Sequence, residues 1–416
     1  MSDQTSQSER VGHTSSPPTV DLRRGTKWVV AKMPPSPKRT WVYRIVAIMV
    51  VLAISAIYIG LTVHVPDVFG LVLRQTFTTA PNIEELVVLA TPFFLTALAV
   101  FIPLRVGLWN IGGEGQFFAG AWLATGLSFW LPHLPGPLLI VGMMFAGAVG
   151  GAVWVTVPML ARVYLNVNEI ISTLMLNLVI VLWVAYWLTG PWQYGGSTGG
   201  TLQSRVIPSQ AQLPLIHLEG GLDSGLIIAL ALTVIAGVVL RFSTFGYESH
   251  IVGAGRPAAM FAGVRTRRVL VTSFLVAGAL AGIAGVLQLA GNSYQLTPGL
   301  SNNTGYLGIA VAILAGDSVV GLGVMACILA AIMLIGQTVQ IYGVSSEAVF
   351  IVIGLLLLFN AIGEALSHFQ LIRRTRVGSS TGAVERDGDW EDASGESGAE
   401  ALVTKTDPVL DRGVGS

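Results

Sequence analysis

One short polar stretch holds the residues best suited to chemistry in a chain that is otherwise mostly apolar. The stretch 103–116, PLRVGLWNIGGEGQ, carries an arginine, two carboxamides, one carboxylate and four glycines between two apolar runs. Inside a membrane every backbone polar group needs a partner, so such a glycine-rich break persists only where protein or a water-filled cavity surrounds it. The chemistry on offer is hydrogen bonding to a polar solute. We therefore take Asn110, Glu114 and Gln116 as candidates for a translocation path.

Glu114 needs its own explanation, because an acidic side chain at the centre of a membrane helix costs about 2.5 to 3.5 kcal/mol on insertion scales. Two interpretations remain open. In the structural one, Glu114 accepts hydrogen bonds from glycine-rich backbone or pairs with Arg105, and it fixes the bend between two apolar runs. In the functional one, the carboxylate and the nearby amides offer hydrogen bonds to the solute.

A second polar cluster opens a later apolar run. The corner RVYLNVNE leads into NEIISTLMLN, which places Asn168, Glu169, Thr173 and Asn177 in or beside the run 170–189. At about 100° per residue, Thr173 and Asn177 are one helical turn apart and share a face. This pattern is consistent with hydrogen bonding between helices and with contact to a solute. All four residues join the path candidates.

Composition determines the class of protein that must position these residues. Hydrophobic residues make up 53% of the 416 positions, charged residues make up 11%, and the mean hydropathy is +0.70. A soluble domain carries nearer a quarter of charged residues, so we predict an all-α polytopic membrane protein. The single cysteine, Cys327, excludes an intrachain disulfide, and its apolar surroundings predict a buried packing thiol.

Ten apolar runs are candidate membrane spans. They are 45–63, 86–104, 117–131, 138–160, 170–189, 225–240, 270–289, 306–316, 319–339 and 348–366. The second is interrupted by Pro92, and the eighth is too short to span unaided, which is typical of a broken or re-entrant helix. The amphipathic segment 68–77 is expected along the outer interface. Glycines four apart in the fourth and seventh runs, such as Gly147 with Gly151 and Gly278 with Gly282, predict close helix packing.

Charge predicts the topology. The segment 241–268 contains five arginines and one acidic residue, Glu248, so the positive-inside rule places it in the cytoplasm. The long polar loop 190–223 has one basic residue and is expected outside. If the eighth run crosses the membrane, there are about ten spans and both termini are cytoplasmic, which we prefer. We expect a basic disordered tail over 1–40, a transmembrane domain over 41–370 and an acidic disordered tail over 371–416.

Four short stretches, in this order along the chain, resemble one family, and the small-residue run AGALAGIAG at 277–285 is the last of them. GLWNIGGEGQ is similar to the corresponding stretch of permease subunits of ABC importers of the nucleoside and simple-sugar group, and NEIISTLMLN resembles the run after their fourth span. The cytoplasmic word GAGRPAAMFAGV resembles the short coupling helix that docks on their ATPase. It matches the family pattern at Gly253, Pro257, Ala258, Ala259 and Gly263. It departs from that pattern at Gly255 and at Arg256, which replaces an asparagine.

The resemblance implies a permease subunit that forms the path for a small polar solute, most often a nucleoside and next a simple sugar. It implies cytosolic ABC ATPase subunits, a second paralogous permease subunit and an extracellular solute-binding lipoprotein as partners, in a prokaryotic plasma membrane. We expect no cofactor on this chain, since ATP and Mg belong to the ATPase, and no metal, nucleic acid or enzymatic activity. The chain contains no GxxxxGK[ST], HExxH or CxxC pattern. A secondary, ion-coupled transporter is the alternative. The segment GAGRPAAMFAGV, which resembles a helix that docks on an ATPase, argues against it.

Overall fold

The computed structural model describes residues 26–32, 37–62, 68–194, 202–216, 222–345, 347–367 and 369–375. Most of the two predicted tails, including 1–25 and 376–416, lies outside the described residues. The chain divides into two compact units, one of residues 1–31 with 370–416 and one of residues 32–369. A two-stranded sheet pairs β1, Thr26–Lys32, with β2, Phe369–Thr375.

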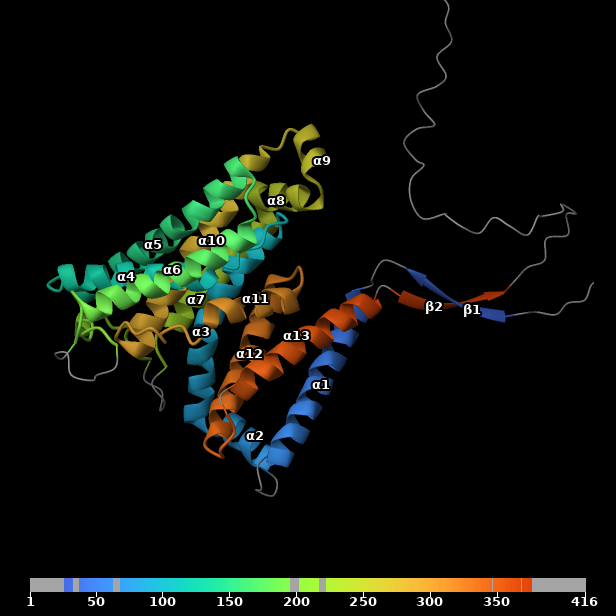
Figure 1. Ribbon diagram of the computed structural model, residues 1–416, viewed down its shortest axis with the longest axis horizontal. Helices are drawn as coiled ribbons and strands as arrows, with labels where there is room; N and C mark the ends of the chain where they lie inside the picture. Colours follow the sequence, from blue (N-terminus) through green and yellow to red (C-terminus); the bar gives the residue numbers. More distant parts are fainter. Residues whose placement is uncertain are drawn as a thin grey trace, which may run out of the picture. The chain divides into compact units, whose positions relative to one another are not determined.

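The second unit is helical (Figure 1). Its elements are α1 (Pro37–Thr62), α2 (Val68–Thr78), α3 (Ala80–Leu104), α4 (Gly113–Trp130), α5 (Gly136–Leu165), α6 (Glu169–Thr189), η1 (Ser209–Ala211), α7 (Gly225–Phe242), α8 (Thr244–Ala254), α9 (Arg256–Phe261), α10 (Thr266–Gln288), η2 (Leu289–Ser293), α11 (Thr304–Ala315), α12 (Val319–Gln340) and α13 (Glu347–Ser367). Where it is described, each predicted apolar run lies in one of these helices or extends one residue past its end.

Six of the described helices are long and apolar enough to cross a membrane: α3, α5, α6, α7, α10 and α12. Shorter apolar helical segments lie in α1, α11 and α13. The prediction of an all-α membrane protein is thus confirmed for the helical unit. One expectation about an element was wrong, because Pro92 lies inside an unbroken α3. A membrane helix tolerates proline where neighbouring groups satisfy the freed backbone.

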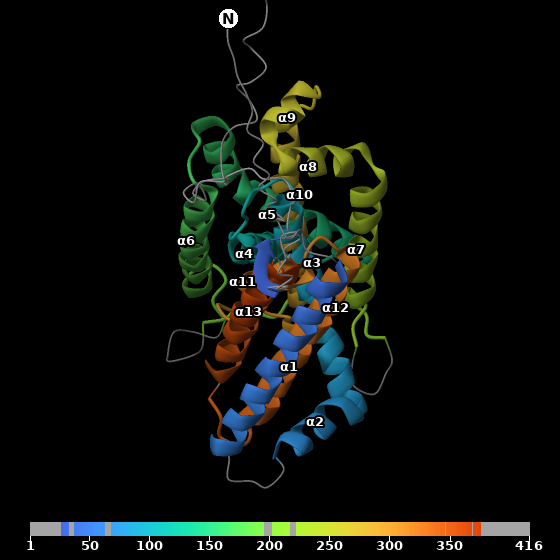
Figure 2. The same ribbon diagram turned by 90° about the vertical axis from the view of Figure 1, so that its right-hand side faces the viewer.

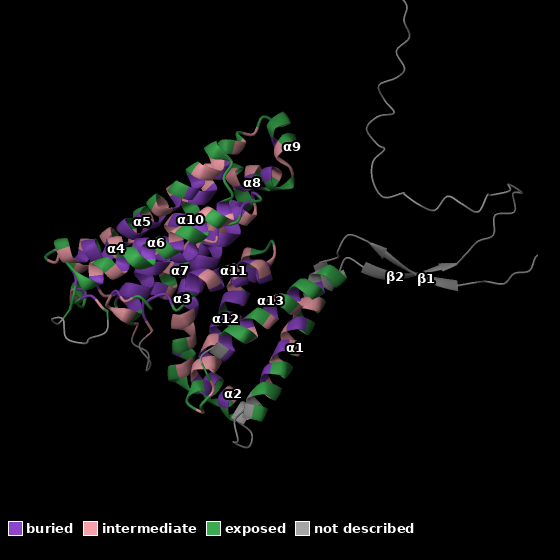
Figure 3. Ribbon diagram, viewed as in Figure 1, coloured by how far each residue is buried: buried purple, intermediate pink, exposed green. Residues whose placement is uncertain are grey.

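The core lies where α3, α4, α10 and α11 meet (Figure 3). In the most apolar window of α3, 78% of residues are buried, whereas the corresponding share is 22% for both α6 and α7. The outer helices therefore show most of their surface to lipid or to other proteins. The inner ones can carry polar groups, provided that those groups find partners in the core.

Glycines bring α5, α10 and α4 into backbone contact. A Cβ atom at Gly151 would overlap the carbonyl oxygen of Gly278, and one at Gly282 would overlap that of Gly147. Gly120 of α4 likewise faces the backbone of Gly282. The close packing predicted from glycine spacing is confirmed, and it holds these three helices in backbone contact beside the polar stretch.

Helices α8 and α9 lie at one end of the helical unit, and α2 lies at the other (Figure 2). Because α7 starts after the loop 190–223 and ends just before α8, that loop belongs to the end opposite α8 and α9. The two segments that the charge pattern assigns to opposite sides are thus separated by the length of α7.

Candidate solute path and coupling loop

The polar stretch is a non-helical break between α3 and α4. Residues 105–112 turn the chain, and a reciprocal amide pair holds the turn together. The Asn110 Nδ2 donates to the Gln116 Oε1 at 2.9 Å, and the Gln116 Nε2 donates to the Asn110 Oδ1 at 2.8 Å. Asn110 also donates to the carbonyl of Ala99 at 2.9 Å, which ties the turn back to α3. Both amides are fully buried.

Glu114 joins α4 to α11. The Ser301 hydroxyl donates to its Oε1, and the Gly305 backbone N–H donates to its Oε2 at 2.9 Å. Gly305 lies in the first turn of α11, so the carboxylate sits at the positive end of that helix dipole. Of the two partners that we considered, the backbone N–H is present, whereas Arg105 instead lies 5.8 Å over the ring of Phe101.

Asn177 joins α6 to the same turn. Its Oδ1 accepts from the backbone N–H of Gly115 at 2.9 Å, and its Nδ2 donates to the carbonyl of Ile111 at 2.9 Å. The Tyr306 side chain also interacts with the side chain of Asn177. Thr173, one turn earlier, donates to the carbonyl of Glu169 at 2.6 Å, inside its own helix. The predicted shared face of α6 exists, and it points at the break.

The start of α6 is a separate ion-pair site. Asn168 caps the helix by accepting from the backbone N–H of Ile170 at 2.9 Å. Glu169 pairs with Arg162 of α5 at 3.1 Å and accepts a long, 3.4 Å hydrogen bond from the backbone N–H of Trp109. Asn168 is exposed at the surface. Through the helix cap and the ion pair, Asn168 and Glu169 hold the corner between α5 and α6.

The structure therefore gathers five of the seven predicted path residues into one buried network, formed by Asn110, Glu114, Gln116, Thr173 and Asn177. We call these five residues with Ser301, Gly305 and Tyr306 the polar network. Sequence reasoning missed the last three, which precede or open α11. The sequence feature that could have identified them is the polar run SNNTGY at 301–306, which leads into an apolar run too short to span a membrane.

The basic segment after α7 forms the two short helices α8 and α9. Gly253 of α8 lies against the Arg105 carbonyl, where a Cβ atom would overlap that oxygen. Pro257 lies in the first turn of α9, where a missing N–H costs nothing. Gly263 follows the helix with a positive φ of 78°, which favours glycine. The contact between Gly253 and Arg105 connects α8 directly to the polar stretch.

The surface of α9 is unusually apolar for an exposed helix. Ala258 is exposed, whereas Ala259 is fully buried against the rest of the chain. Met260 is 66% exposed and Phe261 is 94% exposed. Arg256 begins the helix and is half-buried. Met260 and Phe261 together form an exposed apolar patch with basic residues nearby, and such patches mark sites of contact with another protein or with the membrane.

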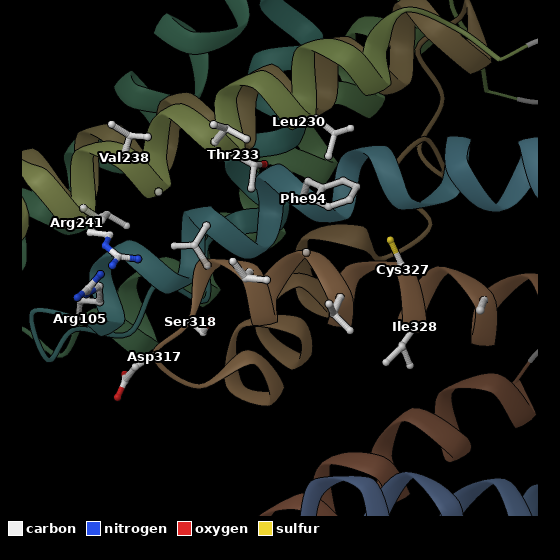
Figure 4. Close-up of a pocket in the computed structure, with 18 of the residues that line it drawn as sticks. Phe94, Arg105, Leu230, Thr233, Val238, Arg241, Asp317, Ser318, Cys327 and Ile328 are labelled. Atoms are coloured by element: carbon white, nitrogen blue, oxygen red, sulfur yellow. The ribbon is translucent and has the colours of Figure 1, made fainter. Parts of the chain in front are cut away.

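A groove of about 1230 Å³ runs between α3, α7 and α12 (Figure 4). Its walls are apolar residues of α7 and α12, among them Leu230, Val234, Val238, Val320 and Val324. Cys327 lines it and is exposed, so the prediction of a buried packing thiol was wrong. The apolar surroundings of Cys327 come from a groove wall, which a sequence pattern does not distinguish from a core. None of the polar network lines this groove.

Where it is described, the loop 190–223 packs on α4 and α6 at the end of these helices opposite α8 and α9. Trp192 is 6% exposed and lies 4.7 Å from Trp187 and 6.1 Å from Trp122, measured between ring centroids. Residues 195–201 and 217–221 of the loop lie outside the described residues. At its end, burial raises the pKa of the Asp223 carboxyl, although the Gly225 N–H bond at 2.5 Å opposes the shift.

Across the described ranges, no group of three or more His, Cys, Asp or Glu side chains could hold a metal ion.

Comparison with known proteins places the chain among transporters. Residues 82–361 match the family described as branched-chain amino acid transport system / permease component. The glucose ABC transporter permease protein of Haloferax volcanii is 31% identical over 376 residues, which cover 85% of this chain and 97% of that protein. No solved structure matches the chain.

Two nucleoside relatives match shorter regions. The guanosine ABC transporter permease protein of Bacillus subtilis is 34% identical over 66% of this chain and 80% of its own length. The nucleoside ABC transporter permease protein of Lactococcus lactis subsp. cremoris is 31% identical over 68% of this chain and 80% of its own length. The comparisons confirm the resemblance noted in the sequence, and nothing in them supports a secondary transporter.

Proposed function

The chain belongs to the family of permease components of branched-chain amino acid transport systems, and from that premise we propose that it forms the path for a nucleoside or, second, a simple sugar. As an ABC permease it is a multi-pass protein of the plasma membrane and not itself an enzyme, since ATP hydrolysis belongs to a separate subunit. The names of the relatives support guanosine and other nucleosides first and glucose next.

The observation that carries this proposal is the polar network at the break between α3 and α4. Its carboxylate, Glu114, already occupies the N-terminus of α11, so that helix end has no place for an anionic solute group. A neutral solute rich in hydroxyl and amide groups suits the remaining carboxamides of Asn110, Gln116 and Asn177. Such a solute can exchange hydrogen bonds with them when the helices separate during transport.

Uptake by the reconstituted complex tests the solute class. Proteoliposomes that contain this chain with its partner subunits should accumulate labelled nucleosides in competition with unlabelled guanosine, and glucose should compete weakly. The Glu114→Gln variant keeps the shape and most of the acceptor capacity, so it should assemble normally and transport poorly. Normal stability together with normal uptake in that variant would remove Glu114 from both the path and the bend.

The number of spans and their orientation form part of the same proposal. Ten spans, with the 12-residue α11 counted as a broken crossing helix, place both termini and α9 inside and the loop 190–223 outside. In a Cys327→Ala background, a cysteine at exposed Ser209 should react with an impermeant thiol reagent added outside, whereas one at exposed Ala258 should not. The reverse labelling would contradict the orientation.

The partners follow from the family. We propose that cytosolic ABC ATPase subunits dock on α9, beside a second paralogous permease subunit and an external solute-binding lipoprotein. ATP and Mg then belong to the ATPase, and this chain binds no cofactor. The sites proposed for docking are Gly253, Arg256, Pro257, Ala258, Ala259 and Gly263, and the exposed Phe261 supports them. Because Ala259 is buried, a bulky residue there would disturb α9 itself.

The sharper docking test therefore uses exposed positions. Ala258→Trp and Phe261→Ala should reduce co-purification of the ATPase and reduce uptake without changing membrane insertion. Tyr194→Ala, on the exposed part of the outer loop, is the control and should leave co-purification intact. Full co-purification in both α9 variants would leave the docking site unsupported.

A further inference from the structure

The groove between α3, α7 and α12 differs from the polar network in its lining. Apart from Thr233, Ser318 and the thiol of Cys327, its uncharged lining is apolar or glycine. Its charged residues are Arg105, Arg241 and Asp317 (Figure 4). All three lie at one end, beside the last turn of α3, the last turn of α7 and the residue before Ser318, which caps α12. The groove therefore has an apolar body and one charged mouth.

The two arginines at this mouth have no carboxylate partner among the described residues. Arg105 lies 5.8 Å over the Phe101 ring, and Arg241 lies 5.5 Å over the Phe242 ring, so aromatic faces are their contacts. Asp317 forms an ion pair with neither of them in that part of the chain. By contrast, Arg162 of α5 is paired with Glu169 at 3.1 Å. Two neighbouring unpaired guanidinium groups attract a phosphate, which each can bind through two N–H groups.

We propose that this groove binds an anionic phospholipid, with its phosphodiester at Arg105 and Arg241 and an acyl chain along α7 and α12. The mouth lies at the membrane end from which the chain continues into the basic helices α8 and α9. Under the proposed topology this is the cytoplasmic leaflet, whose anionic lipids interact with basic pockets between transmembrane helices.

The groove is long enough to hold an acyl chain, since its lining along α3 extends from Leu86 to Arg105, roughly 28 Å at 1.5 Å per residue. Along α7 the lining extends from Leu230 to Arg241, which corresponds to roughly 16 Å at 1.5 Å per residue. Along α12 it extends from Val319 to Ala331, which corresponds to roughly 18 Å by the same rise. Half of the hydrocarbon thickness of a bilayer is roughly 15 Å. An acyl chain anchored at the two arginines would therefore lie along the α7 and α12 walls over their whole length in the groove.

The apolar walls also argue against the transported solute as the occupant. A nucleoside or sugar needs several hydrogen-bond partners when it leaves water, and apart from the charged mouth with its neighbouring Ser318 this groove offers the Thr233 hydroxyl and the Cys327 thiol. The carboxamides that suit such a solute lie in the polar network. A lipid needs what the groove has, which is a continuous apolar wall and a basic mouth.

Native mass spectrometry of the purified full-length chain in detergent tests the proposal. The probes are phosphatidylglycerol and phosphatidylcholine with identical acyl chains. The wild-type chain should bind phosphatidylglycerol preferentially, and the Arg105→Gln/Arg241→Gln double variant should bind it about tenfold more weakly or worse. Val238→Trp places an indole in the open groove at a 50% exposed position and should weaken binding of both lipids. Circular dichroism checks that each variant is folded.

The matched control is Arg268→Gln. Arg268 lines a smaller cavity of about 530 Å³ between α7, α8 and α10, which also contains Glu248. This variant removes one positive charge near the same membrane face and should leave phosphatidylglycerol binding unchanged. Glycerol phosphate, which has the head group without the chains, should not compete. Undiminished phosphatidylglycerol binding in the double variant or in Val238→Trp, or full competition by glycerol phosphate, would overturn the proposal.

Discussion

The polar network and the α3–α7–α12 groove place charge in the membrane in opposite ways. In the network, Glu114 is 5% exposed and both of its oxygens accept hydrogen bonds, from Ser301 and from Gly305. In the groove, Arg105 and Arg241 flank an apolar surface and have no acidic partner within the described part of the chain. In the network the chain itself supplies hydrogen-bond donors to the charged group, whereas in the groove the charged groups are available to a ligand.

This difference has a physical cause. A buried polar group costs free energy unless it is hydrogen-bonded, so the network can exist in the core because its helices supply donors and acceptors to one another. Long arginine side chains at a helix end can reach the interface, and they keep their charge without an internal partner. We therefore expect folding to be affected by substitutions that remove the hydrogen-bonding atoms of the network or crowd its frame, and ligand binding to be affected by substitutions in the groove.

The largest expected effect on the free energy of unfolding is at Gly282, for which Gly323 is the matched control. Gly282→Ala would push the α10 backbone away from Gly147 of α5, and we expect it to lower the free energy of unfolding by about 3 kcal/mol. Gly323→Ala in the groove should change it by less than about 1 kcal/mol, because its Cβ atom would lie an ordinary 3.5 Å from Phe94. Unfolding in mixed detergent micelles measures both. Equal losses of unfolding free energy in the two variants would contradict the difference between the tightly packed frame and the open groove.

Removal of the Glu114 carboxylate should have the next largest effect. Glu114→Ala leaves the Ser301 hydroxyl and the Gly305 N–H buried without an acceptor, so we expect a loss of about 2 kcal/mol in the same assay. Glu85→Ala, at an exposed position of α3, is the control and should be nearly neutral. A silent Glu114→Ala would show that the network is not part of the fold.

A smaller, pH-dependent effect is expected at the opposite end of α7. Burial raises the pKa of the Asp223 carboxyl in the folded state, so the folded chain binds this proton more tightly than the unfolded chain does. The resulting stabilisation is complete below the unfolded-state pKa of about 3.9 and is lost as the pH rises through the higher folded-state pKa. The Tyr294 side chain also faces Asp223 and interacts with its charge. Asp223→Asn should unfold at a higher temperature than the wild type at pH 7, and the difference should vanish near pH 4.

Asp317→Asn is the control for that series. Asp317 is exposed at the mouth of the groove, so its substitution should leave the melting temperature close to that of the wild type at both pH values. A pH-independent gain in Asp223→Asn would contradict the assignment to burial of the carboxylate.

The smallest effect on stability should come from the groove arginines. In lipid-free detergent, the Arg105→Gln/Arg241→Gln variant should unfold within about 0.5 kcal/mol of the wild type, because neither side chain has an internal ion-pair partner in the described residues. Added phosphatidylglycerol should raise the melting temperature of the wild type and not that of the variant. A large loss of stability without lipid would mean that the arginines belong to the fold.

Much of the fold could be predicted from sequence because membrane helices follow local rules. A run of apolar residues must form a helix in lipid, so the candidate spans agree with observed helices, and the glycine spacing of α5 and α10 predicted their contact. The break before Glu114 and the short helix α9 were also visible, since glycine, proline and charge interrupt the apolar pattern there. Pro92 was misinterpreted, because whether a proline ends a membrane helix depends on its neighbours.

The partners of the polar residues were decided by tertiary structure alone. Glu114 meets Ser301 and Gly305, which are almost 200 positions away, and the sequence offered the nearby Arg105 with equal plausibility. Cys327 was assigned to the core, although it lines a groove, because an apolar run is the same pattern whether it faces protein or lipid. Composition and spacing determine which segments enter the membrane. Which polar groups satisfy one another there, and which arginines remain unpaired, depends on how the helices cross.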